Sequence, residues 1–338
     1  MRRENSLRTH FFLSPEALLP EIFAMQQVQI GASDLWGSRL AYGCWRIIAG
    51  GKAVEVTPDR EGAARKAILA AVDAGYTLFD HADIYSDGLG EWVFGRLLRE
   101  NKNLRDKMLI ASKCGIRKEG DPVSSAPYRY DFSADYIIQS CEGSLKRLQT
   151  DRIDLYQLHR PDFLAEPEEV ARAFTKLKDQ GKVREFGLSN ASAAFFTLIQ
   201  KSCSFKLQVN QIEISLTSRD FFRNGTMEQC MLEKITPLAW SPLAAGRLCF
   251  PGQIDLNEPG HAKRIQLRDA IDLVARQHNV SRAVVVIAWL LRHPAGIVPI
   301  IGSADPNNIK DVVKATTLKL SREEWYSLLE GAMGERLP

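Results

Sequence analysis

The sequence lacks a long hydrophobic run and an excess of one charge. Its longest apolar stretch, Ala283 to Leu291, ends at Arg292, well short of the ~20 residues that a membrane-spanning helix needs. The 44 Lys and Arg residues nearly balance the 41 Asp and Glu residues, which leaves a formal net charge of +3. We therefore expect neither a membrane nor a nucleic acid as a partner. With 45% hydrophobic and 25% charged residues, the composition is typical of a globular protein with a large core.

Cysteine motifs are missing as well. The chain has six cysteines, but no two form a CxxC motif and none stands with a histidine at a spacing typical of a metal site. We therefore expect no bound metal. An even number of cysteines formally allows a disulfide framework, although such frameworks belong to short, loop-rich secreted chains. Reduced thiols and a cytoplasmic location are the expectation.

The first 24 residues show no clear strand or helix pattern. Arg2 and Arg3 precede a short apolar run, as in a targeting peptide, but Pro15 and Pro20 interrupt that run and Glu16 is unlike a transit peptide. We treat residues 1–24 as an N-terminal extension, either a loose segment or the product of a start codon placed too early. A single domain is expected over residues 25–338.

An alternation of strand and helix patterns fills the rest of the chain. Short β-branched or apolar runs precede longer segments of helical periodicity, eight times in succession. The expected strands are Leu40–Trp45, Thr77–Ala82, Met108–Lys113, Ile153–His159, Glu185–Ser189, Gln208–Ile214, Pro237–Ser241 and Ile297–Ile301. The expected helices are Pro58–Ala74, Glu91–Glu100, Ala134–Leu148, Pro167–Gln180, Ala193–Ser202, Phe221–Lys234, Gln266–Gln277, Arg282–Leu291, Asn307–Lys314 and Arg322–Glu330.

Eight strand–helix units with short connections predict an α/β fold, a closed (β/α)8 TIM barrel. Several strands are almost continuously apolar, as strands buried on both faces should be. From periodicity alone, a doubly wound sheet remains the alternative. Val28–Ile30 and Leu40–Tyr42 flank a turn rich in Gly, Ser and Asp. These two segments predict an N-terminal β-hairpin that caps the closed end of the barrel.

Three consecutive strands end in ionisable side chains. Asp80 and Tyr85 follow the second strand, Lys113 ends the third and His159 ends the fourth. Catalytic residues of TIM barrels stand at the C-terminal ends of the strands, so we expect these four side chains to meet. Each of them alone has an ordinary structural explanation, such as a capping acid or a core histidine. A lysine that ends an apolar strand needs a partner, however, and Asp80 on the adjacent strand is the obvious one.

Together the four side chains suit proton transfer. A free tyrosine has a pKa of about 10, and a nearby Lys113 ammonium would lower the pKa of Tyr85. Asp80 would hold Lys113 in place, and His159 would orient a substrate carbonyl oxygen toward Tyr85. Tyr85 would protonate that oxygen as a hydride arrives at the carbon. No side chain supplies a hydride, so a nicotinamide cofactor is implied.

The sequence has no glycine fingerprint of a Rossmann dinucleotide site, since the nearest match, Gly88 to Val93, has Val93 in place of the third glycine. A cofactor would therefore lie on the barrel rim. Side chains suited to a carboxamide and to ring stacking are Ser189, Asn190, Gln211 and Trp240. Small residues and backbone N–H groups suited to phosphates follow the seventh and eighth predicted strands. After the seventh they are in the segment from Ser241, Pro242, Leu243 and Ala244 to Arg247, and after the eighth they are Gly302 and Ser303.

At these residues the sequence resembles the aldo-keto reductases. The matching stretches, in family order from about residue 26 to 335, are FDHADIY (79–85), IASKCG (110–115), SLKRLQTDRIDLYQLHRPD (144–162), GLSN (187–190), VNQIE (209–213), AWSPLAAG (239–246) and PIIGS (299–303). The resemblance implies a (β/α)8 barrel that reduces carbonyls with NAD(P)H. It implies a catalytic tetrad of Asp80, Tyr85, Lys113 and His159. It also implies nicotinamide contacts at Ser189, Asn190, Gln211 and Trp240, and a first-strand segment at Gly43, Cys44 and Trp45, with Trp45 in the substrate pocket.

The resemblance leaves the choice between NADPH and NADH open. Family members that prefer the phosphorylated cofactor commonly carry cations after strand eight, where this sequence has the neutral residues Gly302 and Asn308. A 2′-phosphate would need another cation, for which the candidates are Arg247, Lys263, Arg264 and Lys310. We expect NADPH from the habit of the family. His81 replaces the commoner threonine without touching the tetrad.

Two other functions stay open at this point. A Schiff-base aldolase would use Lys113 as its nucleophile, but it would leave the combination of Ser189, Asn190, Gln211 and Trp240 unexplained. The potassium-channel β subunits resemble this fold and act as cofactor-sensing binding modules. For the reductase, residues 115–132 and 244–265 would select a small-molecule carbonyl substrate, and a monomer is the default oligomeric state.

Overall fold

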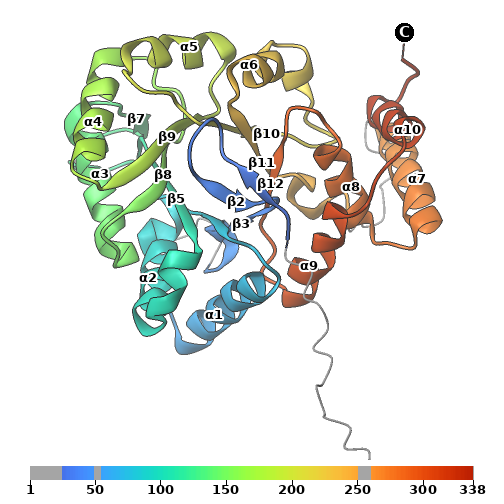
Figure 1. The fold of residues 1–338 in the computed structure, drawn as a ribbon, viewed down its shortest axis with the longest axis horizontal. Helices are drawn as coiled ribbons and strands as arrows, with labels where there is room; N and C mark the ends of the chain where they lie inside the picture. The colour runs from blue at the N-terminus through green and yellow to red at the C-terminus, as the bar shows by residue number, and fades with distance from the viewer. Residues whose placement is uncertain (1–24, 49–54, 250–259, 338) are drawn as a thin grey trace, which may run out of the picture.

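The computed structural model describes residues 25–48, 55–249 and 260–337. Eight parallel strands close a barrel, and helices surround it (Figure 1). Around the barrel the strand order is β3, β4, β5, β8, β9, β10, β11 and β12, so each strand pairs with its neighbours in the chain and β12 pairs with β3. The predicted (β/α)8 barrel is confirmed, and the doubly wound sheet is wrong. The predicted extension over residues 1–24 lies outside the described residues.

The barrel strands agree with the predicted ones to within a few residues. They are β3 (Ala41–Gly43), β4 (Leu78–Asp80), β5 (Leu109–Cys114), β8 (Ile153–Leu158), β9 (Val183–Ser189), β10 (Val209–Glu213), β11 (Thr236–Trp240) and β12 (Val298–Ile301). The helices are α1 (Pro58–Asp73), α2 (Leu89–Glu100), α3 (Ala134–Leu148), α4 (Pro167–Asp179), α5 (Ala193–Ser202), α6 (Thr226–Glu233), α7 (His261–His278), α8 (Arg282–Leu291), α9 (Pro306–Asp311) and α10 (Arg322–Met333).

Two helices begin five residues away from their predicted first residue. The predicted helix Phe221–Lys234 begins only at Thr226, because Gly225 has a left-handed backbone with a φ of 79° and interrupts the helical path. In contrast, α7 begins five residues before the predicted Gln266, at His261. Three of the five added residues, His261, Lys263 and Arg264, are polar, so hydrophobic periodicity gives little signal there.

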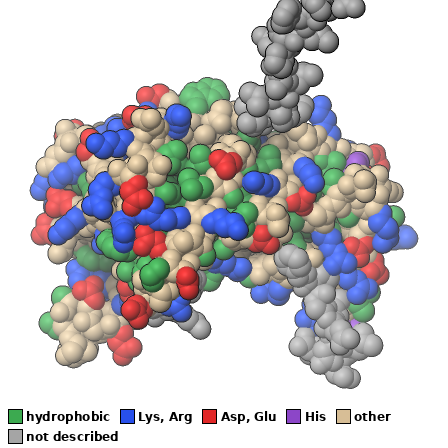
Figure 2. Space-filling model, turned by 90° about the horizontal axis from the view of Figure 1, so that it is seen from below, with side chains coloured by type: hydrophobic (Ala, Val, Ile, Leu, Met, Phe, Trp, Pro, Cys, Tyr) green, Lys and Arg blue, Asp and Glu red, His purple; other side chains and the backbone are tan. Residues whose placement is uncertain are grey.

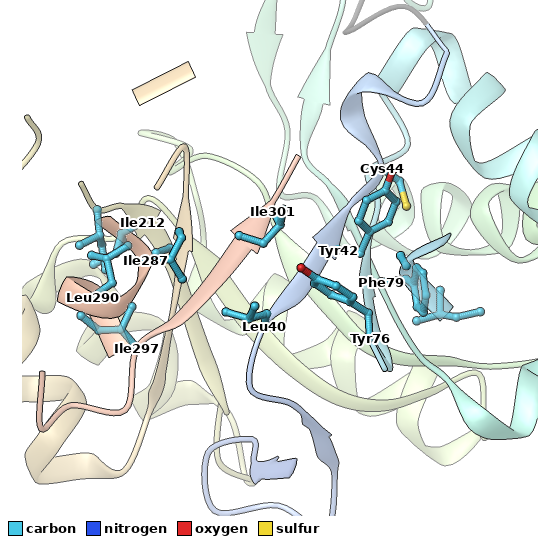
Figure 3. Close-up of a cluster of buried hydrophobic side chains, with 14 of the residues drawn as sticks. Leu40, Tyr42, Cys44, Tyr76, Phe79, Ile212, Ile287, Leu290, Ile297 and Ile301 are labelled. Carbon is cyan, nitrogen blue, oxygen red and sulfur yellow. The ribbon is translucent and has the colours of Figure 1, made fainter. Parts of the chain in front are cut away.

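Apolar side chains fill two layers of the core. Inside the barrel, alternate residues of the strands meet, among them Leu78, Leu109 and Leu155. Outside it, the opposite faces of the strands pack against the helices. Figure 3 shows part of this outer layer, where Tyr42 packs edge-on against Tyr76 and Phe79 with ring centroids 6.1 and 5.9 Å apart. Burial on both faces explains why the strands read as continuous apolar runs.

A hairpin of β1 (Gln27–Gln29) and β2 (Trp36–Ser38) crosses one end of the barrel (Figure 1). The predicted hairpin is confirmed in its first arm, but its second arm is Trp36–Ser38 rather than Leu40–Tyr42. The turn is tighter than predicted because Gly31, with a φ of 60°, reverses the chain early. Its amide donates to Thr236 Oγ1 at 2.7 Å, and Ile30 and Leu35 are buried against the barrel interior. The hairpin therefore closes the end at which the strands begin.

The described surface is mixed in charge. In the face shown in Figure 2, Lys and Arg side chains alternate with Asp and Glu side chains. No helix among the described residues is long and apolar enough to cross a membrane. All six cysteines are free thiols, and five of them are buried. A short antiparallel pair, β6 (Ile116–Arg117) and β7 (Arg129–Tyr130), folds the loop after β5 back over the barrel end.

Candidate active site

A cavity of about 740 Å³ opens at the C-terminal ends of the barrel strands. It is within the size range of small-molecule and cofactor pockets. Most of the residues predicted for the site line it: Gly43, Trp45, Asp80, Tyr85, His159, Ser189, Asn190, Gln211, Trp240, Ser241, Pro242, Leu243, Gly302, Ser303 and Asn308. Four predicted residues do not line it. Lys113, Cys44 and Ala244 are buried in its walls, and Arg247 is exposed outside it.

Lys113 and Asp80 form a buried ion pair between adjacent strands. Lys113 is fully buried and Asp80 is 3% exposed. The Lys113 ammonium donates to Asp80 Oδ1 at 2.7 Å, to Asp80 Oδ2 at 2.8 Å and to the carbonyl of His81 at 2.6 Å. Burial opposes the charged form of Lys113, but the attraction of Asp80 outweighs it and the pKa of Lys113 is raised. Lys113 is therefore a fixed positive charge.

Tyr85 lies beside this charge. The Lys113 Nζ atom is 5.1 Å from the centroid of the Tyr85 ring. Burial raises the pKa of Tyr85 to about 12, and the Lys113 charge counteracts only part of that rise. The prediction that Lys113 acts to lower the pKa of Tyr85 has the correct sign, but the net shift is upward because desolvation is the larger effect. Tyr85 is therefore a neutral phenol at pH 7.

His159 completes the group of four. Its ring meets the Tyr85 ring edge-on, with centroids 5.8 Å apart, and both residues line the cavity. Burial lowers the pKa of His159 well below its ordinary value, and the charges of Lys113 and Arg160 act in the same direction. The imidazole is thus neutral, and its buried Nδ1 atom has no hydrogen-bond partner among the described residues. A neutral imidazole beside a neutral phenol can donate hydrogen bonds to a carbonyl oxygen.

The predicted nicotinamide contacts form one hydrogen-bonded network with Asp80, Lys113 and His159. Gln211 Nε2 donates to Asp80 Oδ1 at 2.8 Å. The Ser189 hydroxyl donates to the backbone carbonyl of Gln211 at 2.8 Å. Asn190 Nδ2 donates to the carbonyl of His159 at 2.9 Å, and Asn190 Oδ1 accepts from the Trp240 indole at 2.9 Å. The network fixes the orientation of each amide and of the Trp240 ring at the cavity wall.

Backbone strain is concentrated in the loop after β11. Ser241, Ala244 and Ala245 have φ values of 50°, 50° and 58°, which L-residues rarely adopt. Strain of this kind costs on the order of 1–3 kcal/mol per residue and clusters at ligand sites. Alternating backbone conformations of this sort turn successive N–H groups toward one point and make a concavity for anions. This loop is therefore suited to phosphate groups.

The far end of the cavity is formed by the start of α8 and by α9. Ser281, Arg282 and Asp311 line it together with Asn308. Arg282 is held by Asp272, with its Nε and Nη2 atoms 2.5 and 2.8 Å from the carboxylate oxygens. Asp311 Oδ2 accepts from the Ser281 hydroxyl at 2.6 Å. None of the four cations predicted for a 2′-phosphate lines the cavity, whereas Arg282 does.

Sequence reasoning missed several lining residues, notably Arg46, Lys118, Arg160 and Arg282. Arg46 and Arg160 directly follow Trp45 and His159, so an extension of the strand-end argument by one residue would have found them. Arg282 begins a helix far from any strand end in the sequence, and no local pattern points to it. Among the described residues, no group of His, Cys, Asp and Glu could hold a metal ion.

Comparisons with known proteins agree with this geometry. A sequence profile described as the aldo/keto reductase family matches residues 39–330. The chain is 40% identical over 316 residues to a 6-dehydroglucose reductase of Novosphingobium aromaticivorans, with 92% of this chain and 96% of that protein covered. It is 37% identical to the oxidoreductase YdhF of Escherichia coli, with 93% and 100% covered. A solved glycerol dehydrogenase from Gluconobacter oxydans superposes with a TM-score of 0.79 at 26% identity, covering 92% of this chain and 97% of that one.

Proposed function

The chain belongs to the aldo/keto reductase family of oxidoreductases, and on that premise we propose that it reduces an aldehyde or ketone to an alcohol with NAD(P)H. One observation carries the proposal. The rings of Tyr85 and His159 meet in a T-shaped arrangement on the cavity wall, and the ammonium of the buried Lys113–Asp80 pair lies 5.1 Å from the centroid of the Tyr85 ring. This arrangement offers a carbonyl oxygen two neutral hydrogen-bond donors and a fixed positive charge.

In the proposed mechanism, Tyr85 is the general acid. A carbonyl oxygen between the Tyr85 hydroxyl and the His159 imidazole accepts a hydrogen bond from each. The Tyr85 proton moves to that oxygen as negative charge develops there, and the Lys113 ammonium stabilises the resulting phenolate. Asp80 keeps Lys113 charged and in position. A reduced nicotinamide, when bound, supplies the hydride that reaches the carbonyl carbon.

The residues of the cavity fit a nicotinamide dinucleotide. Ser189, Asn190 and Gln211 offer amide and hydroxyl groups for a carboxamide, and Trp240 offers a flat face whose orientation Asn190 fixes. The strained loop Ser241–Gly246 and the segment Gly302–Ser303 would hold the phosphates with backbone N–H groups.

NADPH is the proposed form of the cofactor, and Arg282 is the residue proposed to favour it. Among the described residues, Arg282 is the cation at the far end of the cavity, beside Asn308. Its Nη1 atom is not used in the two hydrogen bonds to Asp272 and can meet a 2′-phosphate. Asp311 lies at the same end and could accept from a ribose hydroxyl, so NADH remains an alternative.

A small carbonyl compound is the proposed substrate, and its sugar-derived members are the first to test, because two relatives are named 6-dehydroglucose reductases. We further propose a single catalytic domain over residues 25–338 that acts as a cytoplasmic monomer. The geometry disfavours the aldolase alternative. A Schiff-base lysine must be neutral and reach its substrate, whereas Lys113 is charged, buried and held by its hydrogen bonds. Borohydride should therefore trap no substrate on Lys113.

A turnover screen tests the proposed function. The purified full chain is given sugar-derived aldehydes, simple aldehydes, ketones and quinones, with NADPH and NADH in parallel, and loss of absorbance at 340 nm is followed. We expect carbonyl-dependent oxidation of at least one nucleotide, faster with NADPH. Nucleotide binding without oxidation by any carbonyl would overturn the reductase assignment and favour the cofactor-sensing module.

A further inference from the structure

The part of the cavity around Tyr85 and His159 is unusually rich in positive charge. Among the described lining residues on this side, the charged side chains near the mouth are Arg46, Lys118 and Arg160. The one carboxylate there, Asp80, is buried and bound to Lys113. Asp311, the other lining carboxylate, belongs to the far end beside Arg282. A cleft lined by one sign of charge attracts ligands of the opposite sign.

Two of these cations are available for a ligand. Lys118 is paired with Asp87, but Arg46 and Arg160 are exposed and form no ion pair with a described residue. The fourth cation of the described cavity lining, Arg282, is paired with Asp272. The absence of such a partner therefore sets Arg46 and Arg160 apart from the other two cations of the described cavity lining.

Both arginines are positioned by residues of the site. Arg160 directly follows His159 at the end of β8, so its backbone is fixed by the hydrogen bond of His159 N to the carbonyl of Cys114 at 2.8 Å. Its charge acts on His159 and on Tyr128, another residue of the cavity wall. Arg46 directly follows Trp45 after β3, and its guanidinium lies over the Trp45 ring at 5.5 Å from the centroid.

We propose that the carbonyl substrate carries an anionic group, a carboxylate or a phosphate, which Arg160 and Arg46 bind at the cavity mouth. The proposal rests on the proposed reductase function and adds the charge of its substrate. A planar guanidinium binds either anion through two parallel hydrogen bonds. Such contacts fix the distance between the anion and the reacting carbonyl, so the substrate class is an aldehyde or ketone with an acidic group a few bonds away.

Matched pairs of aldehydes test this assignment. Succinic semialdehyde and butanal differ by a carboxylate, and glyceraldehyde 3-phosphate and glyceraldehyde differ by a phosphate. For the unmodified protein we expect kcat/KM to be about tenfold or more higher for the anionic member of at least one pair, with a preference that shrinks as ionic strength rises. The pair that shows the preference identifies the anion.

Three variants assign the preference to the two arginines. In Arg160→Gln, and further in the double variant with Arg46→Gln, the ratio of kcat/KM between the anionic and the neutral aldehyde should fall toward one, mainly through KM. Arg276→Gln is the matched control, because Arg276 is exposed on α7 and outside the cavity lining, and it should keep the ratio. Equal kcat/KM within both pairs in the unmodified protein, or a ratio that the double variant retains, would overturn this inference. In either case, turnover of the neutral aldehydes would still support the proposed reductase function.

Discussion

The side-chain amide of Gln211 donates a hydrogen bond to Asp80 Oδ1 at 2.8 Å. The same oxygen accepts from Lys113 at 2.7 Å, so a residue proposed to hold the cofactor also fixes the carboxylate that binds Lys113. No described residue donates to Gln211 Oε1, which leaves this oxygen for a donor in the cavity. Cofactor contacts and proton-transfer groups are therefore parts of one network.

Lys113→Met tests whether Lys113 acts through Tyr85. Burial already raises the pKa of Tyr85 to about 12, and Lys113 is the main influence that lowers it. Loss of the ammonium should raise that pKa further and make Tyr85 a weaker acid. We expect kcat for reduction to fall roughly 10²-fold or more. In the reverse reaction, where the phenolate is the base, the rise of the rate with pH should begin at higher pH.

The measurement compares the pH–rate profiles of the unmodified protein and of Lys113→Met, for carbonyl reduction and for the reverse oxidation of the alcohol. Lys182→Met, which removes a half-buried lysine paired with Glu142 and outside the cavity lining, serves as the control. A profile of unchanged shape in Lys113→Met would mean that Lys113 does not tune Tyr85.

Trp240→Phe tests the stacking surface. Trp240 lines the cavity and its indole is held by Asn190, so titration with NADPH or NADH should quench tryptophan fluorescence, and the variant should lose much of that signal. The background comes from Trp36, Trp45, Trp92, Trp289 and Trp325. Trp92→Phe, which removes an indole outside the cavity lining, should keep the quench. A full quench in Trp240→Phe would refute the stacking assignment.

Arg282→Gln tests the choice of cofactor. If Arg282 meets a 2′-phosphate, the variant should raise the Kd for NADPH roughly tenfold and leave the Kd for NADH nearly unchanged. The difference between the two nucleotides in the unmodified protein should shrink as salt rises. Isothermal titration with both nucleotides measures this, with Arg276→Gln as the control. An equal loss of affinity for both would show that Arg282 supports the helix end and does not select the phosphate.

His81 predicts how stability depends on pH. Burial lowers the pKa of His81 to about 3, and neither ring nitrogen has a hydrogen-bond partner among the described residues. The unfolded chain binds a proton at His81 below about pH 6.5 but the folded chain does not, so stability is present above pH 6.5 and is lost as pH falls toward 3. The slope from this residue approaches about 1.4 kcal/mol per pH unit.

Urea unfolding of the unmodified protein and of His81→Gln between pH 7 and pH 4 checks this account. The difference in unfolding free energy between the two should move in favour of the variant as pH falls, because glutamine does not titrate. A difference that is constant across this range would show that His81 does not titrate as proposed.

Much of the fold could be predicted from the sequence because local residue patterns indicate its strands and helices. Alternating apolar runs and helical periods placed all eight barrel strands, and strand ends located Asp80, Tyr85, Lys113 and His159. The parts that were missed depend on packing between distant segments. The early reversal at Gly31 shortened the hairpin, and desolvation rather than charge decided the pKa of Tyr85.

The residues at the far end of the cavity, where the 2′-phosphate of a cofactor would lie, were the hardest to predict. Arg247 directly follows the AWSPLAAG stretch of the resemblance and was a candidate cation, yet it is exposed outside the cavity, whereas Arg282 reaches the cavity from the start of α8. The position of Arg282 depends on how α8 packs against the barrel, which no local pattern encodes. Charge alone therefore could not identify the relevant cation.

The central claim is that Tyr85 protonates a carbonyl oxygen while a nicotinamide hydride reaches the carbon. The most direct test gives the protein an aldehyde together with NADPH or NADH deuterated at C4 of the nicotinamide, and locates the label in the product by NMR. The account predicts deuterium on the carbinol carbon. It also predicts that Tyr85→Phe, with unchanged circular dichroism and nucleotide binding, forms this product 10²–10⁴-fold more slowly. Product without deuterium at that carbon, or a Tyr85→Phe variant with nearly unmodified kcat, would contradict it.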